Sequence, residues 1–168
     1  MGKNHPAETL TLTHDYGPGV DLRLLQPAAH EAGHALACVA AGYAIADIRV
    51  WHTSNSAAGA LQLADDIDDR QATDELLVSL VAGHEAEVNW LSLNTNHPSR
   101  ERALRETQPG CCTDLELFAR YRRRSRQASL TEAAARGRAE ALLRRHWRRV
   151  ERLTVRLARA KHLTNPTG

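Results

Sequence analysis

The sequence predicts a mainly α-helical protein with a small β-hairpin, which is an α+β fold class. Long segments repeat their apolar residues at helical spacing, whereas two short segments alternate apolar and polar residues as strands do. Aromatic residues make up only 4% of the 168, so leucine, valine and alanine must fill the core. A chain of this length suits one domain, which we expect over residues 26–163.

The first part of the chain combines a turn-rich arm with a helix. Residues 1–25 are predicted to form an irregular N-terminal arm, because Gly17-Pro18-Gly19 marks a bend. The first helix is expected over residues 27–41, since proline suits the first helical position and Gly42 can end the helix. This helix is rich in alanine, which lets neighbouring elements approach it closely.

A hairpin is expected next. Residues 48–51 and residues 60–63 each alternate apolar and polar side chains, and a polar stretch of Ser, Asn and Gly separates them. The acidic run at residues 65–69 lacks the Asp-x-Asp-x-Asp-Gly order of a calcium loop. It therefore predicts a solvated turn rather than a metal site.

The second helix is predicted from Ala72 to Leu93, where apolar residues recur at helical steps. His84 and Glu87 lie three residues apart on the same inward face of this helix. Burying a titratable group costs several kcal/mol unless a partner compensates it. The pair is either a satisfied core pair or a support for a charged site, and both interpretations are open at this point.

The last third of the chain is predicted to hold two helices. Residues 94–110 form a polar connector, and Thr113 with Glu116 then has the pattern of a capping box that starts a helix running to about Arg126. A long helix follows over residues 131–161, with an apolar stripe on one face and arginines elsewhere. Residues 164–168 are left as a C-terminal tail. The apolar stripe consists of Leu143, His146, Val150, Leu153, Leu157 and Ala160.

Charge is divided unevenly between the two parts of the chain. Residues 1–110 carry 7 basic and 15 acidic side chains, a net charge of −8, whereas residues 111–168 carry 15 and 5, a net charge of +10. The two parts either attract one another or recruit an acidic partner such as nucleic acid. Nucleic acid is not the expected partner, because the arginines lack interleaved aromatic residues and a binding motif.

Neither a membrane span nor a secretory leader is expected. The longest uncharged apolar run, Ala35–Ala46, falls well short of the ~20 residues that cross a bilayer. The first residues lack a hydrophobic stretch that could act as a signal. The three cysteines, two of them adjacent at Cys111 and Cys112, fit free thiols better than a disulfide framework. We therefore expect a cytoplasmic protein.

The most informative segment is His30-Glu31-Ala32-Gly33-His34, an HExxH motif inside the first predicted helix. Residues four apart lie on one helix face, so both imidazoles can bind one cation while Glu31 points toward the same pocket. Zinc suits this arrangement. Two histidines on a helix surface are the alternative, and a chance HExxH in a chain of this composition has a probability of roughly a few percent.

A catalytic zinc needs a third protein ligand and an open position for water. Asp114 is the best candidate, because the amides and the macrodipole in the first turn of its helix favour an ionised carboxylate. Glu87 is the rival candidate. Cys111 and Cys112 are less suited, since they flank a helix start instead of forming a Cys-x-x-Cys turn.

Several motifs together resemble the peptidase domain of the FtsH-type ATP-dependent zinc metalloproteases. The string from His30 to Ala35 is similar to the zinc-binding helix of that family, and residues 60–61 to the strand pair that follows it. Residues 81–87 are similar to its Gly-Gly-Arg-Ala-Ala-Glu-Glu helix, and Cys112-Thr113-Asp114-Leu115 to its Asn-Asp-Leu segment. The resemblance covers residues 26–163 in order and is strongest at the first motif.

The resemblance implies a zincin-like metallopeptidase domain. By this resemblance His30, His34 and Asp114 bind zinc, Glu31 acts as the general base, and Glu87 and His84 support the ligands from behind. An extended substrate would add to the hairpin edge at Ala60, Leu61 and Gln62. One departure from the family is that His84 replaces its arginine.

A second departure is that no Gly-x-x-x-x-Gly-Lys-Ser/Thr phosphate loop occurs, so the ATPase module of the family is absent. The substrates are therefore expected to be flexible or unfolded segments, unless a separate ATPase or an adaptor partner delivers folded ones. Two alternatives stay open. One is a repressor-clipping regulator of the ImmA/IrrE sort. The other is a non-catalytic zinc-containing adaptor whose arginine-rich helices bind a partner.

Overall fold

The computed structural model describes residues 12, 14–96 and 99–166, and over these residues it confirms an α+β fold dominated by helices. The predicted arm, connector and tail therefore lie partly outside the described residues. The elements, including two 3-10 helices labelled η, follow in chain order: η1 (Leu22–Leu24), α1 (Leu25–Ala40), β1 (Ile45–His52), β2 (Ala57–Leu63), α2 (Asp74–Asn94), α3 (Arg100–Thr107), η2 (Gln108–Cys111), α4 (Cys112–Arg124), α5 (Glu132–Ala160) and β3 (His162–Thr164).

The sheet has three antiparallel strands in the order β2-β1-β3. The predicted hairpin is confirmed as β1 and β2, and each strand begins three residues earlier than the sequence pattern indicated. The predicted helix over residues 131–161 is confirmed as α5, and the third strand, which the sequence pattern did not predict, follows it directly. Lys161 takes a left-handed backbone conformation with φ of 64°, which ends α5 and turns His162–Thr164 alongside β1. Leu163 thereby enters the core.

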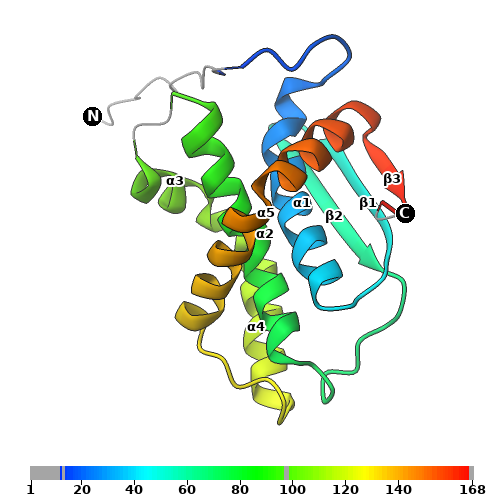
Figure 1. Ribbon diagram of the computed structural model, residues 1–168, viewed down its shortest axis with the longest axis vertical. Helices are drawn as coiled ribbons and strands as arrows, with labels where there is room; N and C mark the ends of the chain where they lie inside the picture. Colours follow the sequence, from blue (N-terminus) through cyan, green and yellow to red (C-terminus); the bar gives the residue numbers. More distant parts are fainter. Residues whose placement is uncertain (1–11, 13, 97–98, 167–168) are drawn as a thin grey trace.

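The helices stack beside one side of the sheet. In Figure 1, α1 lies between the sheet and α2, and α5 crosses in front of both helices before the chain reaches β3. Helix α4 lies behind the lower part of α2. Because α1 is surrounded by other elements, most of its side chains are buried, and this explains its many small residues.

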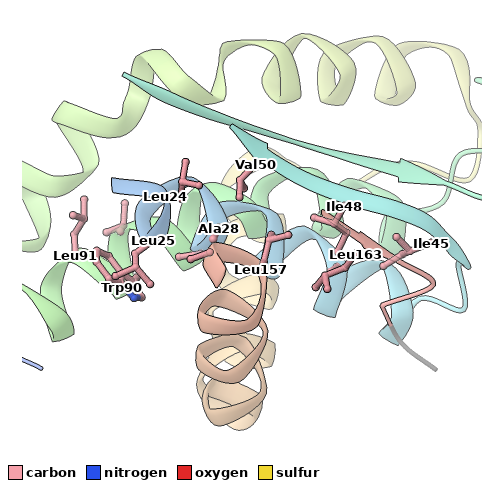
Figure 2. Close-up of a cluster of buried hydrophobic side chains, with 14 of the residues drawn as sticks. Leu24, Leu25, Ala28, Ile45, Ile48, Val50, Trp90, Leu91, Leu157 and Leu163 are labelled. Atoms are coloured by element: carbon pink, nitrogen blue, oxygen red, sulfur yellow. The ribbon is translucent and has the colours of Figure 1, made fainter. Parts of the chain in front are cut away.

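The larger apolar cluster joins the sheet to the helices. Figure 2 shows side chains from β1 and β3 pointing toward those of α1 and α5, with Trp90 and Leu91 of α2 at one end. Ile48 and Leu157 are completely buried there. A second cluster lies between α2, α4 and the start of α5, and it includes Leu77, Phe118 and Ala139. The two clusters fix α1, α2 and α4 relative to one another.

Helices α1 and α4 both start differently from the sequence prediction, because a 3-10 helix leads directly into each of them. Helix α1 begins at Leu25, two residues before Pro27, because η1 leads into it and Asp21 accepts a hydrogen bond from the amide of Arg23. Proline is tolerated there, since the amides of a first turn have no partner within the helix. Helix α4 begins at Cys112 directly after η2.

The predicted capping box of α4 is therefore wrong. Thr113 lies inside the helix, and Cys111 is the N-terminal flanking residue and makes no side-chain cap. Asp114 nevertheless lies in the first turn, as predicted. The connector of residues 94–110 also holds more structure than expected, because it contains α3 and most of η2.

Three further predictions can be compared with the structure. Asp69 of the acidic run forms ion pairs with Arg120 and Arg124, so part of that turn is held by α4. All three cysteines are free thiols. Across residues 14–96 and 99–166, no helix is both long and apolar enough to cross a lipid bilayer.

Candidate metal centre

Three side chains from two helices converge on one point. His30 and His34 lie one turn apart on α1, and Asp114 comes from the first turn of α4. Nε2 of His30 is 3.0 Å from Nε2 of His34 and 3.2 Å from Oδ2 of Asp114, and Nε2 of His34 is 3.3 Å from the same oxygen. This group could hold a metal ion.

Hydrogen bonds on the far side of each imidazole orient the ligand nitrogens. Nδ1 of His34 is 2.7 Å from the backbone oxygen of Ser79, and Nδ1 of His30 is 3.0 Å from Oε2 of Glu87. Both oxygens can only accept hydrogen bonds, so each Nδ1 carries the proton and donates it. In the neutral rings, both Nε2 atoms therefore direct lone pairs at each other and at Asp114.

Such a convergence of electron pairs is repulsive unless a positive charge lies between them. Donor atoms about 2.0–2.1 Å from a tetrahedral ion lie about 3.3–3.4 Å apart, close to the separations found here. Without a metal, a second proton takes that place on His30: burial lowers the pKa of His30, but hydrogen bonds with Asp114 and Glu87 raise it to about 10. Burial raises the pKa of Asp114, and the stronger opposing effect of both histidines holds it below its usual range.

Glu87 lies behind His30 and outside the group that could hold a metal ion. Its carboxylate accepts hydrogen bonds from His30 on one oxygen and, at 2.8 Å, from Nε2 of Gln26 on the other. It faces Nδ1 of His30, on the opposite side of the ring from the ligand nitrogen. A carboxylate in this position fixes the orientation of a ligating imidazole and makes it more basic. The geometry therefore favours Asp114 over Glu87 as the third member of the group that could hold a metal ion.

His84 has a different environment from Glu87, although both lie on the inward side of α2. Nη1 of Arg136 donates to its Nδ1 at 3.0 Å, so its Nε2 donates to Thr107 at 2.8 Å. Neither hydrogen bond goes to a ligand. Burial and the positive charge of Arg136 lower the pKa of His84, which keeps the ring neutral as these bonds require. His84 is thus a satisfied core histidine. Of the two interpretations of the pair, the core one applies to His84 and the supporting one to Glu87.

Glu31 lies on the same helix between the two histidines and is 6% exposed. It faces the sheet: a Cβ atom placed on Gly59 of β2 would lie 2.7 Å from its Oε1. Burial raises the pKa of Glu31, and the charges of His34 and His30 oppose that shift. A carboxylate held near a cation, with its pKa raised by burial, has the properties of a proton acceptor in catalysis.

Close backbone approach, made possible by glycine, positions the ligand helix. A Cβ on Gly83 of α2 would lie 2.3 Å from Nε2 of His34, and one on Gly33 would lie 2.4 Å from the backbone oxygen of Ala82. Any larger residue at these positions would push α1 and α2 apart or displace the His34 ring. The two helices can present the histidines to Asp114 only because these positions lack side chains.

A cleft of about 1190 Å³ opens over the three side chains. Its lining comes from η1, α1, β2, α2 and α4, and it includes His30, Glu31, His34 and Asp114. Strand β2 forms one wall and is an edge strand, since β1 is its one partner within the described part of the chain. Of the predicted edge residues, Ala60 and Leu61 line the cleft and Gln62 does not.

No cysteine belongs to the group that could hold a metal ion. Cys38 lines the cleft, but burial raises the pKa of its thiol to about 11, so it stays protonated at neutral pH. Cys111 and Cys112 direct their sulfur atoms to the backbone oxygen of Gln108. Among the described residues, the one group arranged to hold a metal ion is that of His30, His34 and Asp114.

Comparison with known proteins leaves the function to be inferred from this geometry. No family model matches the chain, and no curated protein is significantly similar to it. The sequence identified the three converging residues and the supporting glutamate. It missed Gln26, the backbone oxygen of Ser79 and the two close-contact glycines, Gly59 and Gly83. A backbone oxygen leaves no signal in a sequence, and a glycine signals close approach only when its neighbour is known.

Proposed function

We propose that the protein is a zinc-dependent endopeptidase that hydrolyses peptide bonds in flexible or unfolded segments. The observation that carries this proposal is the convergence of two Nε2 lone pairs and a carboxylate oxygen within 3.0–3.3 Å, beside a buried glutamate in an open cleft. Two imidazoles and one carboxylate leave a fourth position for water at a tetrahedral ion. This donor set is typical of catalytic zinc rather than of closed structural sites.

When bound, zinc would supply a water of lowered pKa and a positive charge that polarises a peptide carbonyl. The residues of the chain would transfer the protons and orient the imidazoles. Glu31 accepts a proton from the attacking water and returns it to the departing amine. The oxygens of Ser79 and Glu87 keep both imidazoles in the tautomer that presents Nε2 to the ion. The raised pKa of Glu31 favours the second of its two steps, in which it acts as an acid.

The edge of β2 suggests how a substrate binds. An unpaired strand edge along a cleft can hydrogen-bond an extended peptide through its backbone. Ala58, Gly59 and Ala60 line the cleft with little side-chain bulk, so a peptide added to this edge would run past Glu31. Only an extended segment fits such an edge, which favours unfolded substrates and makes a separate ATPase or adaptor necessary for folded ones.

The test compares two variants in which one carboxylate becomes an amide. Elemental analysis of the purified protein should give about one zinc per chain, and the protein should cleave casein. Glu31→Gln should retain the zinc and lose cleavage, whereas Glu140→Gln, at an exposed position of α5, should retain both. His34→Ala should lose the metal and the activity together.

Three results would contradict the proposal, each in a different way. Full activity of Glu31→Gln would remove Glu31 from the reaction. Iron in place of zinc would favour oxygen chemistry, because two histidines and one carboxylate also suit non-haem iron. A fully metallated protein that cleaves neither casein nor an unstructured peptide would favour the non-catalytic adaptor.

A further inference from the structure

The second half of α5 carries a dense array of positive charge. Residues 144–161 contain eight arginine or lysine residues and a single acidic one, Glu151. We call one part of this array the basic face of α5, and every member of it is exposed. The basic face consists of Arg144, Arg145, Arg148, Arg149, Arg152 and Arg156.

The arginines of the basic face form no ion pair with any described carboxylate. Other arginines do: Arg120 and Arg124 pair with Asp69, and Arg136 pairs with Glu85. Two carboxylates of α5 lie close by in sequence: Glu140, four residues before Arg144, forms no ion pair with a described residue, and Glu151 accepts a hydrogen bond at 2.9 Å from the indole of Trp147. Like charges three and four residues apart on a helix repel each other. Because the described residues do not neutralise this charge, the basic face can attract negative charge from other molecules.

The shape of α5 directs these charges outward. The apolar side of the helix is used in the core, where Leu143 and Val150 pack in one cluster with Ala32 of α1. His146 departs from helical geometry, with φ of −119°, and kinks the helix within the basic face. A hollow of about 550 Å³ lies there, lined by arginines together with His146 and Trp147. None of its lining residues lines the metal cleft.

Spacing and chemistry favour phosphate groups as the ligand. Arg148, Arg152 and Arg156 are four residues apart on the part of α5 that follows the kink, which is about 6 Å along a helix, and Arg144 extends the charged surface before the kink. Guanidinium groups bind phosphate oxygens with two parallel hydrogen bonds. A regular row of such groups suits a polyanion better than a single small anion.

Other anionic partners fit less well. A membrane-binding helix needs exposed apolar residues to insert, but the large exposed apolar side chains of the described residues are Leu22, Val39, Trp51 and Leu93, all outside α5. Single-stranded nucleic acid needs aromatic side chains free to stack, and Trp147 is half-buried and hydrogen-bonded. An acidic protein partner would need an apolar anchor at the centre of the interface.

We propose that the basic face of α5 binds the phosphate backbone of duplex DNA without reading its base sequence. Backbone binding requires neither aromatic residues nor a recognition motif, so the earlier sequence argument against nucleic acid does not apply to it. The wide major groove of B-DNA also leaves room for exposed arginine side chains between its two phosphate strands, whereas the narrow groove of an RNA duplex does not. This proposal stands independently of the metal centre and of any peptidase activity.

The test measures binding of the purified protein to a fluorescein-labelled 24-base-pair DNA of arbitrary sequence by anisotropy between 50 and 300 mM NaCl. The triple variant Arg144→Ala, Arg148→Ala, Arg152→Ala should bind at least about tenfold more weakly at the lowest salt. The slope of log K against log salt should become shallower by about three, one for each lost phosphate contact. Changing the base sequence should leave the affinity unchanged.

A matched control removes the same charge elsewhere. Arg122→Ala, Arg123→Ala, Arg126→Ala changes three exposed arginines that also form no ion pair with a described residue, and it should bind DNA like the wild type. Circular dichroism and metal content should be the same for all three proteins. Equal weakening by both triple variants would overturn the proposal. So would absence of wild-type binding at 50 mM NaCl, or tighter binding to an RNA duplex, polyglutamate or vesicles containing phosphatidylglycerol.

Discussion

The α1–α2 layer carries charged groups on both of its sides, and the two sides treat them in opposite ways. On the cleft side, His30, His34 and Asp114 converge, and each imidazole is fixed by an oxygen behind it. On the side covered by α5, the basic face projects arginines that have no partner among the described residues. The first arrangement could hold a metal ion, and the second is a concentration of exposed positive charge.

This difference separates the two proposed binding surfaces in physical terms. The cleft depends on fixed geometry, because a buried ligand displaced by 1 Å no longer reaches the ion. The basic face depends on the amount of charge, because exposed guanidinium groups can adjust to a phosphate backbone. Substitutions in the cleft should therefore have large and local effects, whereas those on α5 should act in proportion to the charge removed.

The largest effect is expected where the cleft loses a ligand. Asp114→Asn removes the only negatively charged donor, so zinc affinity should fall by more than the roughly 10- to 100-fold typical of a supporting partner. Glu87→Gln keeps a hydrogen-bond acceptor behind His30 and should stay within that range. Competition with a chromophoric chelator measures both affinities. The reverse order would make Glu87 the ligand.

A smaller effect is expected when geometry changes but no polar group is lost. Gly83→Ala places a Cβ only 2.3 Å from Nε2 of His34, so the ring must move. Zinc affinity should then fall about 10-fold or more. Overpacking should also lower stability by about 1–3 kcal/mol. The same chelator competition and a thermal melt give the two values.

Gly137→Ala is the matched control for this substitution. It makes the same change in α5, where a Cβ meets nothing within 4 Å. It should leave zinc affinity unchanged and raise stability by about 0.5–1 kcal/mol, because alanine favours the helix. If both variants bind zinc like the wild type, the contact of α2 with His34 does not control the site.

The parts of this site that sequence reasoning could predict are those that depend on local spacing. Two histidines four residues apart must share a helix face, and Asp114 lies in a first turn whichever residue caps the helix. The capping box failed because η2 continues into α4 and supplies the helix start that a side-chain cap would otherwise provide. Local rules cannot anticipate a 3-10 turn that is held by its neighbours.

The parts that could not be predicted depend on contacts between distant segments. Strand β3 is too short to show alternation, and it forms only because β1 offers an edge beside the end of α5. His84 and Glu87 are both titratable residues on the inward face of the same predicted helix, so the sequence does not distinguish their roles. Their hydrogen-bond partners do: Arg136 for His84 and His30 for Glu87. The charge imbalance between the two parts of the chain was visible, but which arginines lack partners was not.

The smallest effect concerns a contact that ties the two sides of the molecule together. Asp74 at the start of α2 accepts hydrogen bonds from the amides of Ser129 and Leu130, in the loop that leads into α5. Burial raises the pKa of Asp74, but these hydrogen bonds together outweigh it and hold the pKa below its usual value. A lowered pKa in the folded state stabilises the protein above about pH 4, and this contribution is lost as the pH falls further.

Asp74→Asn should therefore lower the free energy of unfolding at pH 7 by roughly 0.3–1 kcal/mol, since a charge is lost from a first helical turn. The difference from the wild type should shrink as urea melts are repeated from pH 5 to pH 3. Asp65→Asn, in an exposed turn, provides the control and should melt like the wild type throughout. A difference that stays constant with pH would mean that hydrogen-bond geometry, rather than the charge of Asp74, holds α2 to the loop before α5.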